Sequence, residues 1–270
     1  MTLRPNIYCW IVTLTMLGAC WLTQTAISAQ PEPAAVAAEN RLIPYRAEYK
    51  VRRNGKKIGK LTATLSQDPN DDSLWRYRLE SEATDWLVRL LGISTLEVAI
   101  FEIHDGRIRP LFYRMDSREP GSDRHWQHRY DWPNLQSSSD THEGDLTIPL
   151  TPNTLDPLTL RLAMGMLASE PDAESWPFDI VERDEVERQF IRLIDRSRIE
   201  IGERCFDTIQ FYRFRREGSS RNYYAWHAPA LNGLPVKVRH DDDDHVIEMR
   251  LTNWQFDRNA FAASSEFNCN

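Results

Sequence analysis

Apolar and polar residues alternate along most of the chain after residue 40. In YRAEYKV, residues 45–51, every second side chain is apolar and those between are charged. A period of two is typical of an antiparallel strand with one buried and one solvated face. Turn signals such as Asn54-Gly55 separate the alternating segments. The pattern therefore predicts a mainly β fold, an antiparallel meander that forms a curved sheet or an open barrel.

About twelve strands are expected, six before residue 150 and six after residue 185. In the second group we assign separate strands to residues 188–195 and 197–202, because the alternation is interrupted between them. No internal repeat and no low-complexity tract divides this region. A single β-rich domain over residues 41–258 is the simplest interpretation.

Two segments have helical instead of strand periodicity. Residues 85–92, DWLVRLLG, place three leucines on one face and predict a short helix. Residues 153–170 contain Pro157 followed by a long apolar run, which predicts a second helix of about four turns. Thr154 or Asp156 would cap its N-terminus, a structural role that we prefer to catalysis for this carboxylate. Both helices are expected to pack on the sheet or to plug it.

The N-terminus has the pattern of a targeting segment. Arg4 precedes an apolar run over residues 8–22, which is shorter than the ~20 apolar residues of a typical membrane span. Cleavage after Ala29 would release a soluble protein, whereas the LGAC sequence ending at Cys20 would give a lipoprotein anchored at that cysteine. We favour release, and retention as an uncleaved anchor is the third alternative. The expected layout is a signal peptide at 1–29, a flexible tether at 30–40, the β domain at 41–258 and a tail at 259–270. The predicted location is the periplasm, and the only membrane attachment expected is the lipid anchor at Cys20.

Charge limits the classes of partner. The formal net charge is -7 at pH 7, with 27% charged residues. An acidic protein is a poor candidate for binding nucleic acid or anionic lipid through charge alone. We therefore expect no nucleic-acid partner.

Two of the four cysteines lie in the targeting segment, so Cys205 and Cys269 remain in the body of the protein. An oxidising compartment favours a disulfide between them. Two free thiols are the alternative, because the distance between the cysteines cannot be read from the sequence.

Several segments occur in the order found in a known family. They include FEIHDGRIRPLFYRM, NYYAWHAPALNGLPVKVRH, the run Thr154-Leu155-Asp156-Pro157, and Asn54-Gly55 followed by Gly59. Over roughly residues 41–254 the chain resembles a widespread bacterial exported family catalogued as domain of unknown function 3108. The resemblance implies a periplasmic, β-rich protein and supplies neither an activity nor catalytic residues. The order of meander and helices is also similar to open-barrel proteins that carry or receive lipoproteins and lipids between bacterial membranes, which is an analogy of fold alone.

Motifs for catalysis are missing from the sequence. It contains no Gly-x-Ser-x-Gly and no phosphate-binding glycine loop, and its cysteines and histidines lack zinc-ligand spacing. HDDDDH, residues 240–245, could hold a divalent cation, but its place between two strands favours a solvated hairpin turn. His125 and His128 would lie on opposite faces of a strand and could not share a metal ion. We expect no cofactor, no metal and no enzymatic activity.

Aromatic residues are frequent on the predicted strands. A large packed core explains most of them. An alternative is an apolar groove between sheet and helices, able to hold an acyl chain, with residues 85–92 as a lid or plug. The residues assigned to this groove are Trp75, Tyr77, Trp86, Leu87, Leu90, Leu91, Trp126 and Trp226.

Two functions remain open on these grounds. The first is a binding or carrier protein of the cell envelope that holds a lipid or another apolar ligand in this groove. The alternative is an interaction or assembly factor of the periplasm that binds an envelope protein through a sheet face or edge, without a small ligand. An enzyme is the third and least favoured class, because no nucleophile, base and orienting group can be assembled.

Overall fold

The computed structural model describes residues 42–83, 94–119, 122–169, 173–216, 221–242 and 245–257. These residues all belong to one compact unit of the chain. The targeting segment, the helix predicted at residues 85–92 and the tail predicted from residue 259 lie outside the described residues. The signal peptide, the tether and the domain boundaries therefore stay predictions.

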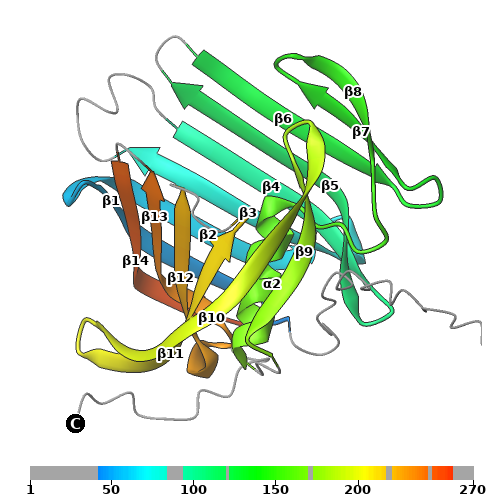
Figure 1. Cartoon of the computed structure of the whole chain (residues 1–270). Coiled ribbons are helices and arrows are strands. Elements are labelled where there is room, and N and C mark those ends of the chain that lie inside the picture. The colour runs from blue at the N-terminus through cyan, green and yellow to red at the C-terminus, as the bar shows by residue number, and fades with distance from the viewer. Residues whose placement is uncertain are drawn as a thin grey trace, which may run out of the picture. The chain divides into compact units, whose positions relative to one another are not determined.

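The described residues form one antiparallel sheet of fourteen strands (Figure 1), with the strand order β8-β7-β6-β5-β4-β3-β2-β1-β14-β13-β12-β11-β10-β9. Strands that follow one another in sequence pair with each other, except β8 and β9, which form the two edges, and the first and last strands, β1 and β14, pair in the middle. The predicted meander is thereby confirmed. The strands are β1 (Tyr45–Arg53), β2 (Lys56–Asp68), β3 (Asp71–Ala83), β4 (Ser94–His104), β5 (Arg107–Glu119), β6 (Ser122–Asp131), β7 (Gln136–Thr141), β8 (Gly144–Pro149), β9 (Ser175–Glu182), β10 (Glu185–Ile201), β11 (Arg204–Phe214), β12 (Asn222–Ala228), β13 (Leu234–Asp242) and β14 (His245–Phe256).

The expectation of about twelve strands was wrong in detail. It missed β7 and β8, whose sequences QSSSDT and GDLTIP have few apolar residues to alternate, and it missed β9. It also divided β10 into two strands. The register of β10 against β11 shifts between Leu193 and Asp195, and this bulge interrupts the alternation without ending the strand.

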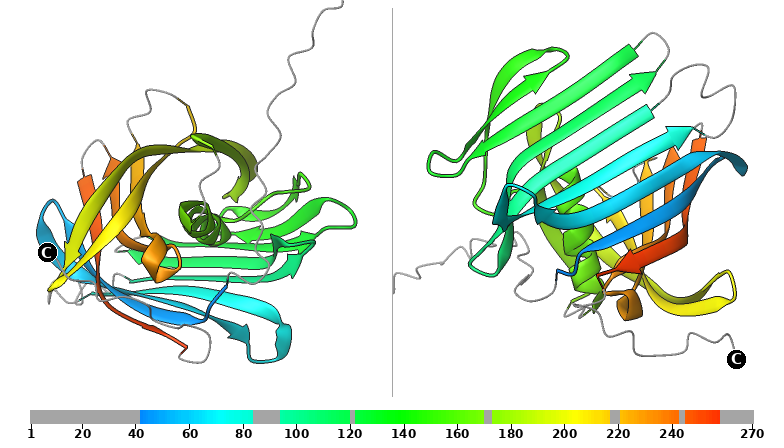
Figure 2. Two further views of the ribbon diagram at one scale, coloured as in Figure 1. Left: turned by 90° about the horizontal axis from the view of Figure 1, so that it is seen from below. Right: turned by 180° about the vertical axis from the view of Figure 1, so that it is seen from behind.

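The sheet is strongly curved but not closed, because β8 and β9 are free edges (Figure 2). Leu155 joins β9 through two backbone hydrogen bonds of 2.9 Å, with Asp179 and Val181. An apolar cluster of Ile148, Leu150 and Val181 forms beside this bridge. The edge of β9 is therefore partly covered by the chain itself.

One α-helix, α2 (Pro157–Ser169), is present among the described residues, and it confirms the second predicted helix. It lies inside the curve of the sheet and contacts β4, β5, β9 and β12 (Figure 2). Ten of its residues are buried, as expected for a helix that is apolar on nearly every side. Together with inward-facing aromatic and aliphatic residues of the strands it forms one large core. No helix in the described part of the chain is both long and apolar enough to cross a membrane.

The C-terminal half of α2 packs against a turn that follows the short 3-10 helix η1 (Pro229–Leu231). A Cβ atom on Gly165 would lie 2.8 Å from the carbonyl oxygen of Gly233. Gly233 itself has φ +73°, in the left-handed region that favours glycine. Two glycines therefore allow helix and turn to approach backbone to backbone.

Candidate functional site

The residues predicted to line one groove are not brought together. Trp75 and Tyr77 share the inner face of β3 and join the core. Trp126 is buried on β6, far along the sheet from β3. Trp226 lies on the outer face of β12, since its neighbours Ala225 and His227 fill the core. The remaining four residues, Trp86, Leu87, Leu90 and Leu91, lie outside the described residues.

Trp226 belongs to a series of aromatic side chains on the outer face of β10, β11 and β12. Neighbouring ring centroids are 5.1–6.4 Å apart. Two cations lie over rings of the series, since Lys237 Nζ is 4.4 Å from the terminal Trp226 ring and Arg192 is 4.6 Å from the Phe214 ring. The rings are, in order, Phe190, Phe214, Tyr212, Tyr224 and Trp226. Of this series only Trp226 was predicted from the sequence as a site residue, and the strand pattern did not say which face of the sheet carries it.

The interior between α2 and the sheet is largely filled. Two cavities of about 30 Å³ each lie on either side of Arg161, and both are lined by Tyr77 and Pro235. A volume of this size suits about one water molecule, whereas ligand pockets usually hold 300–1,000 Å³. Neither of these two cavities thus offers space for an acyl chain.

A charged pair lies in this interior. Arg161 of α2 reaches Glu97 of β4 at 3.7 Å, and Tyr113 Oη donates a 3.2 Å hydrogen bond to the same carboxylate. Burial alone would lower the pKa of Arg161, but the charge of Glu97 and the surrounding tyrosines raise it above the ordinary value. The guanidinium therefore stays charged and links the helix to the sheet.

Asp156 is the cap of α2, as the sequence predicted. Its Oδ1 accepts hydrogen bonds of 2.8 Å from the backbone N–H groups of Leu158 and Thr159, and Thr159 Oγ1 accepts one of 3.0 Å from the Asp156 N–H. The other oxygen, Oδ2, is buried without a hydrogen-bond partner among the described residues. Burial raises the pKa of Asp156 to about 7 despite these bonds.

This pKa predicts a pH-dependent effect of Asp156→Asn. Because the folded-state pKa lies above the unfolded value, ionisation favours unfolding, and the stability contributed by Asp156 falls as pH rises from about 4 to about 7. Between about pH 5 and pH 7 the variant should gain roughly 2 kcal/mol in unfolding free energy relative to the wild type, since an amide can still cap the helix. Urea unfolding of both proteins at both pH values measures the difference. A difference that does not change with pH would contradict the assignment.

Two buried histidines are neutral structural residues. Burial lowers the pKa of both His128 and His227 to about 4. His128 Nδ1 lies 2.7 Å from Ser139 Oγ, and His227 Nδ1 donates to the Gly233 carbonyl at 2.7 Å. His125 lies on the opposite face of β6, half exposed, so the predicted separation from His128 is confirmed.

Residues 240–245 span the end of β13 and the start of β14, which places them at a hairpin as predicted. Within the described ranges no group of three or more histidine, cysteine and acidic residues is placed to hold a metal ion. Cys205 lies in β11, while Cys269 lies outside the described residues, so the disulfide stays a prediction.

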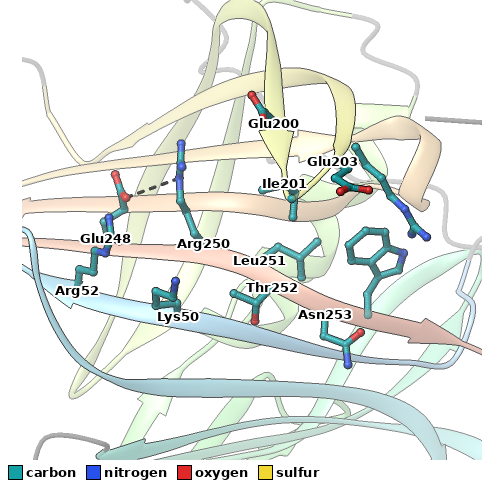
Figure 3. Close-up of a pocket in the computed structure, with 13 residues that line it drawn as sticks. Lys50, Arg52, Glu200, Ile201, Glu203, Glu248, Arg250, Leu251, Thr252 and Asn253 are labelled. Atoms are coloured by element: carbon teal, nitrogen blue, oxygen red, sulfur yellow. Dashed lines mark ion pairs between the residues drawn. The ribbon is translucent and has the colours of Figure 1, made fainter. Parts of the chain in front are cut away.

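Open clefts lie on the surface. One, of about 580 Å³, separates the β10–β11 turn from β14 and β1 (Figure 3). Its charges nearly balance, with Lys50, Arg52, Arg204 and Arg250 against Glu200, Glu203 and Glu248. We call it the β14 cleft.

The second, of about 870 Å³, is formed where β9, β11 and β13 end and β10 and β12 begin. Six of its twelve lining residues are arginines and two are glutamates, so we call it the arginine cleft. Its lining residues are Glu182, Arg183, Glu187, Arg188, Gln189, Arg213, Phe214, Arg215, Arg216, Arg221, Tyr223 and His240. Sequence reasoning missed this site, because its arginines are scattered over about forty positions and only strand pairing gathers them.

Ion pairs fix part of the wall of the arginine cleft. Arg215 bonds Glu187 at 2.6 Å and Glu182 at 3.0 Å. Arg188 binds the buried Asp179 at 2.8 and 3.1 Å in a two-pronged contact. Burial raises the pKa of Glu182, but the charges of nearby arginines outweigh it and hold that pKa below its usual value. Glu182 is therefore ionised, and both glutamates of the wall are already engaged by Arg215.

Residues 45–252 match the family model described as "Protein of unknown function (DUF3108)". The chain belongs to the DUF3108 family. This confirms the resemblance seen in the sequence, and the family description assigns no activity.

Among solved structures, the DUF3108 chain is similar to the β-barrel-like protein of domain of unknown function DUF1849 from Brucella abortus. The two are 11% identical, the match covers 80% of this chain and 99% of that chain, and the TM-score is 0.52. At this identity the likeness shows the fold alone. It agrees with a barrel-like sheet.

Two further structures match with low TM-scores. They are the MucA/MucB complex of Pseudomonas aeruginosa, at 13% identity, 86% and 56% coverage and a TM-score of 0.32, and a putative outer membrane lipoprotein-sorting protein domain from Vibrio parahaemolyticus, at 9% identity, 80% and 86% coverage and a TM-score of 0.21. Such scores carry no argument about function. No curated protein matches the DUF3108 chain.

Proposed function

We propose that this DUF3108 protein is an exported, non-enzymatic protein of the cell envelope that binds another protein at the arginine cleft. The targeting segment supports export, either as a soluble periplasmic protein or as a lipoprotein anchored at Cys20. Binding of a partner at the cleft is supported by the contrast between interior cavities of about 30 Å³ and a surface cleft of about 870 Å³.

The composition of the cleft supports a protein partner. Small-molecule pockets are mostly apolar with few polar groups. Eight of the twelve residues lining this cleft are charged, and arginine is enriched where proteins meet. A catalytic role is not proposed, because the titratable groups near the cleft are engaged in ion pairs instead of forming a nucleophile–base arrangement.

Crosslinking in cells tests this proposal. A photoreactive amino acid at the exposed Arg216 should give one discrete crosslinked protein, whereas the same residue at the exposed Glu80 on β3 should not. Adding Arg213→Glu should abolish the crosslink from position 216, because it reverses a charge inside the cleft. Equal labelling from both positions, or none from position 216, would overturn the proposal.

Binding of a lipid or another apolar ligand is the second candidate. The two cavities beside Arg161 support it, because aromatic and aliphatic residues line them, such as Met166 in one and Met249 in the other. A ligand would require α2 to move away from the sheet, since neither cavity holds an acyl chain as it stands. Lipid that copurifies in a fixed ratio with the protein would favour this candidate.

A further inference from the structure

We propose that the arginine cleft recognises an acidic segment of its partner, a run of carboxylate side chains bound by Arg183, Arg213 and Arg216. This inference rests on the proposed function, since it specifies the chemistry of the partner at the same cleft. The whole chain has a net charge of -7, but the lining of the cleft is dominated by arginines and is positively charged. A cleft of one sign attracts ligands of the opposite sign.

Three of the six arginines are committed to carboxylates of this chain. Arg188 binds Asp179, Arg215 binds both glutamates of the wall, and Arg221 lies 3.7 Å from Asp242. These contacts hold the walls, and their four carboxylates more than offset the charge of the three arginines. The excess positive charge of the lining therefore comes from the other three arginines.

Aromatic rings orient two of the remaining three. The Arg183 guanidinium lies 5.7 Å from the Trp126 ring, and that of Arg213 lies 4.6 Å from the Tyr223 ring. A guanidinium stacked on a ring keeps its N–H edge available for a two-pronged bond to a carboxylate. Arg216 is exposed at the end of β11. Among the described residues, no carboxylate oxygen lies within 4.0 Å of the side-chain nitrogens of these three arginines.

The positions of the three arginines favour separated charges over a single multiply charged ion. Arg183 lies in the turn between β9 and β10, which reaches across to Trp126 on β6, whereas Arg213 lies near the end of β11 and Arg216 two residues beyond that strand. Cations on separate elements match single negative charges spaced along a peptide. One phosphate group would require several arginines to converge on one point.

Binding of a labelled peptide tests the inference with the full mature protein. The probe is a fluorescein-labelled peptide of about ten glutamates, followed by fluorescence anisotropy at several salt concentrations. We expect saturable binding that weakens with salt, and a loss of affinity of about tenfold or more in the Arg213→Gln/Arg216→Gln variant. Arg250→Gln in the β14 cleft is the control and should change the affinity less than about twofold.

Circular dichroism and thermal unfolding of each variant show whether it is folded. The inference would be overturned if the cleft variant and the control lost equal affinity for the peptide. It would also be overturned if inositol hexakisphosphate bound more tightly than the peptide and depended on the same arginines. A crosslink from position 216 that persists while the peptide fails to bind would leave the protein partner in place and reject only its acidic character.

Discussion

Gly233→Ala is expected to destabilise the domain by about 4 kcal/mol. A Cβ atom there would overlap the backbone carbonyl of Gly165, so helix and turn must separate. Overpacking of this kind typically costs 1–3 kcal/mol, and a left-handed alanine adds about 1–2 kcal/mol. Urea unfolding followed by circular dichroism measures the loss.

Gly55→Ala is the matched control. Gly55 has φ +80°, close to that of Gly233, but nothing lies within 4 Å of its hypothetical Cβ atom. The Gly55→Ala variant should lose only about 1 kcal/mol of unfolding free energy, the cost of placing alanine in the left-handed backbone region. Equal losses in the two variants would show that the close approach of α2 and the turn does not stabilise the core.

Glu97→Gln is expected to cost about 3 kcal/mol. Removal of the carboxylate leaves the Arg161 guanidinium largely buried without its counter-charge, which is far more costly than loss of a surface pair. The control is Glu80→Gln, which breaks a 2.8 Å pair with Arg78 on the exposed face of β3 and should cost about 0.5 kcal/mol or less.

The double variant Glu97→Leu/Arg161→Met separates charge from packing. It should be more stable than Glu97→Gln, because neither partner is then left as an unpaired buried charge. If the double variant loses as much stability as Glu97→Gln or more, the cost does not come from an unpaired buried charge and our explanation is wrong. Unfolding free energies from the same urea series provide the comparison.

Local patterns in the sequence predicted most of the fold. Alternation identified strands such as β1 and β14, where one face packs in the core, and the apolar run after Pro157 identified α2. The same signal failed for β7, because the face that it buries carries polar residues, Ser137, Ser139 and Thr141, and for β8, which is short and has few apolar residues. Strands stabilised mainly by pairing with neighbours give little periodicity to detect.

The candidate site was much less predictable. The period of two places Trp226 and Ala225 on opposite faces of one strand. Which of these faces turns inward depends on the packing of α2 against the whole sheet. The arginine cleft depends on the ends of five strands lying side by side, which is tertiary information. The cap at Asp156 was predictable, because capping involves only the next few residues along the chain.

The interior is the basis on which we favour one of the two functions that the sequence left open. A carrier of lipid needs a hollow space, and the space between α2 and the sheet is occupied by buried aliphatic and aromatic side chains. The surface instead offers a charged cleft whose arginines are partly neutralised and partly available. This distribution is the physical basis for the proposed binding of a protein partner.

Mass spectrometry of the protein isolated from its own cell envelope tests most directly the claim that the interior is packed and holds no lipid. Spectra under native conditions retain bound lipid, whereas denaturing spectra retain only covalent groups such as a lipid on Cys20. We predict that the native mass includes no noncovalently bound lipid, because neither cavity beside Arg161 has room for an acyl chain. A native mass that exceeds the denatured mass by one lipid per chain would contradict a packed interior and support the carrier function.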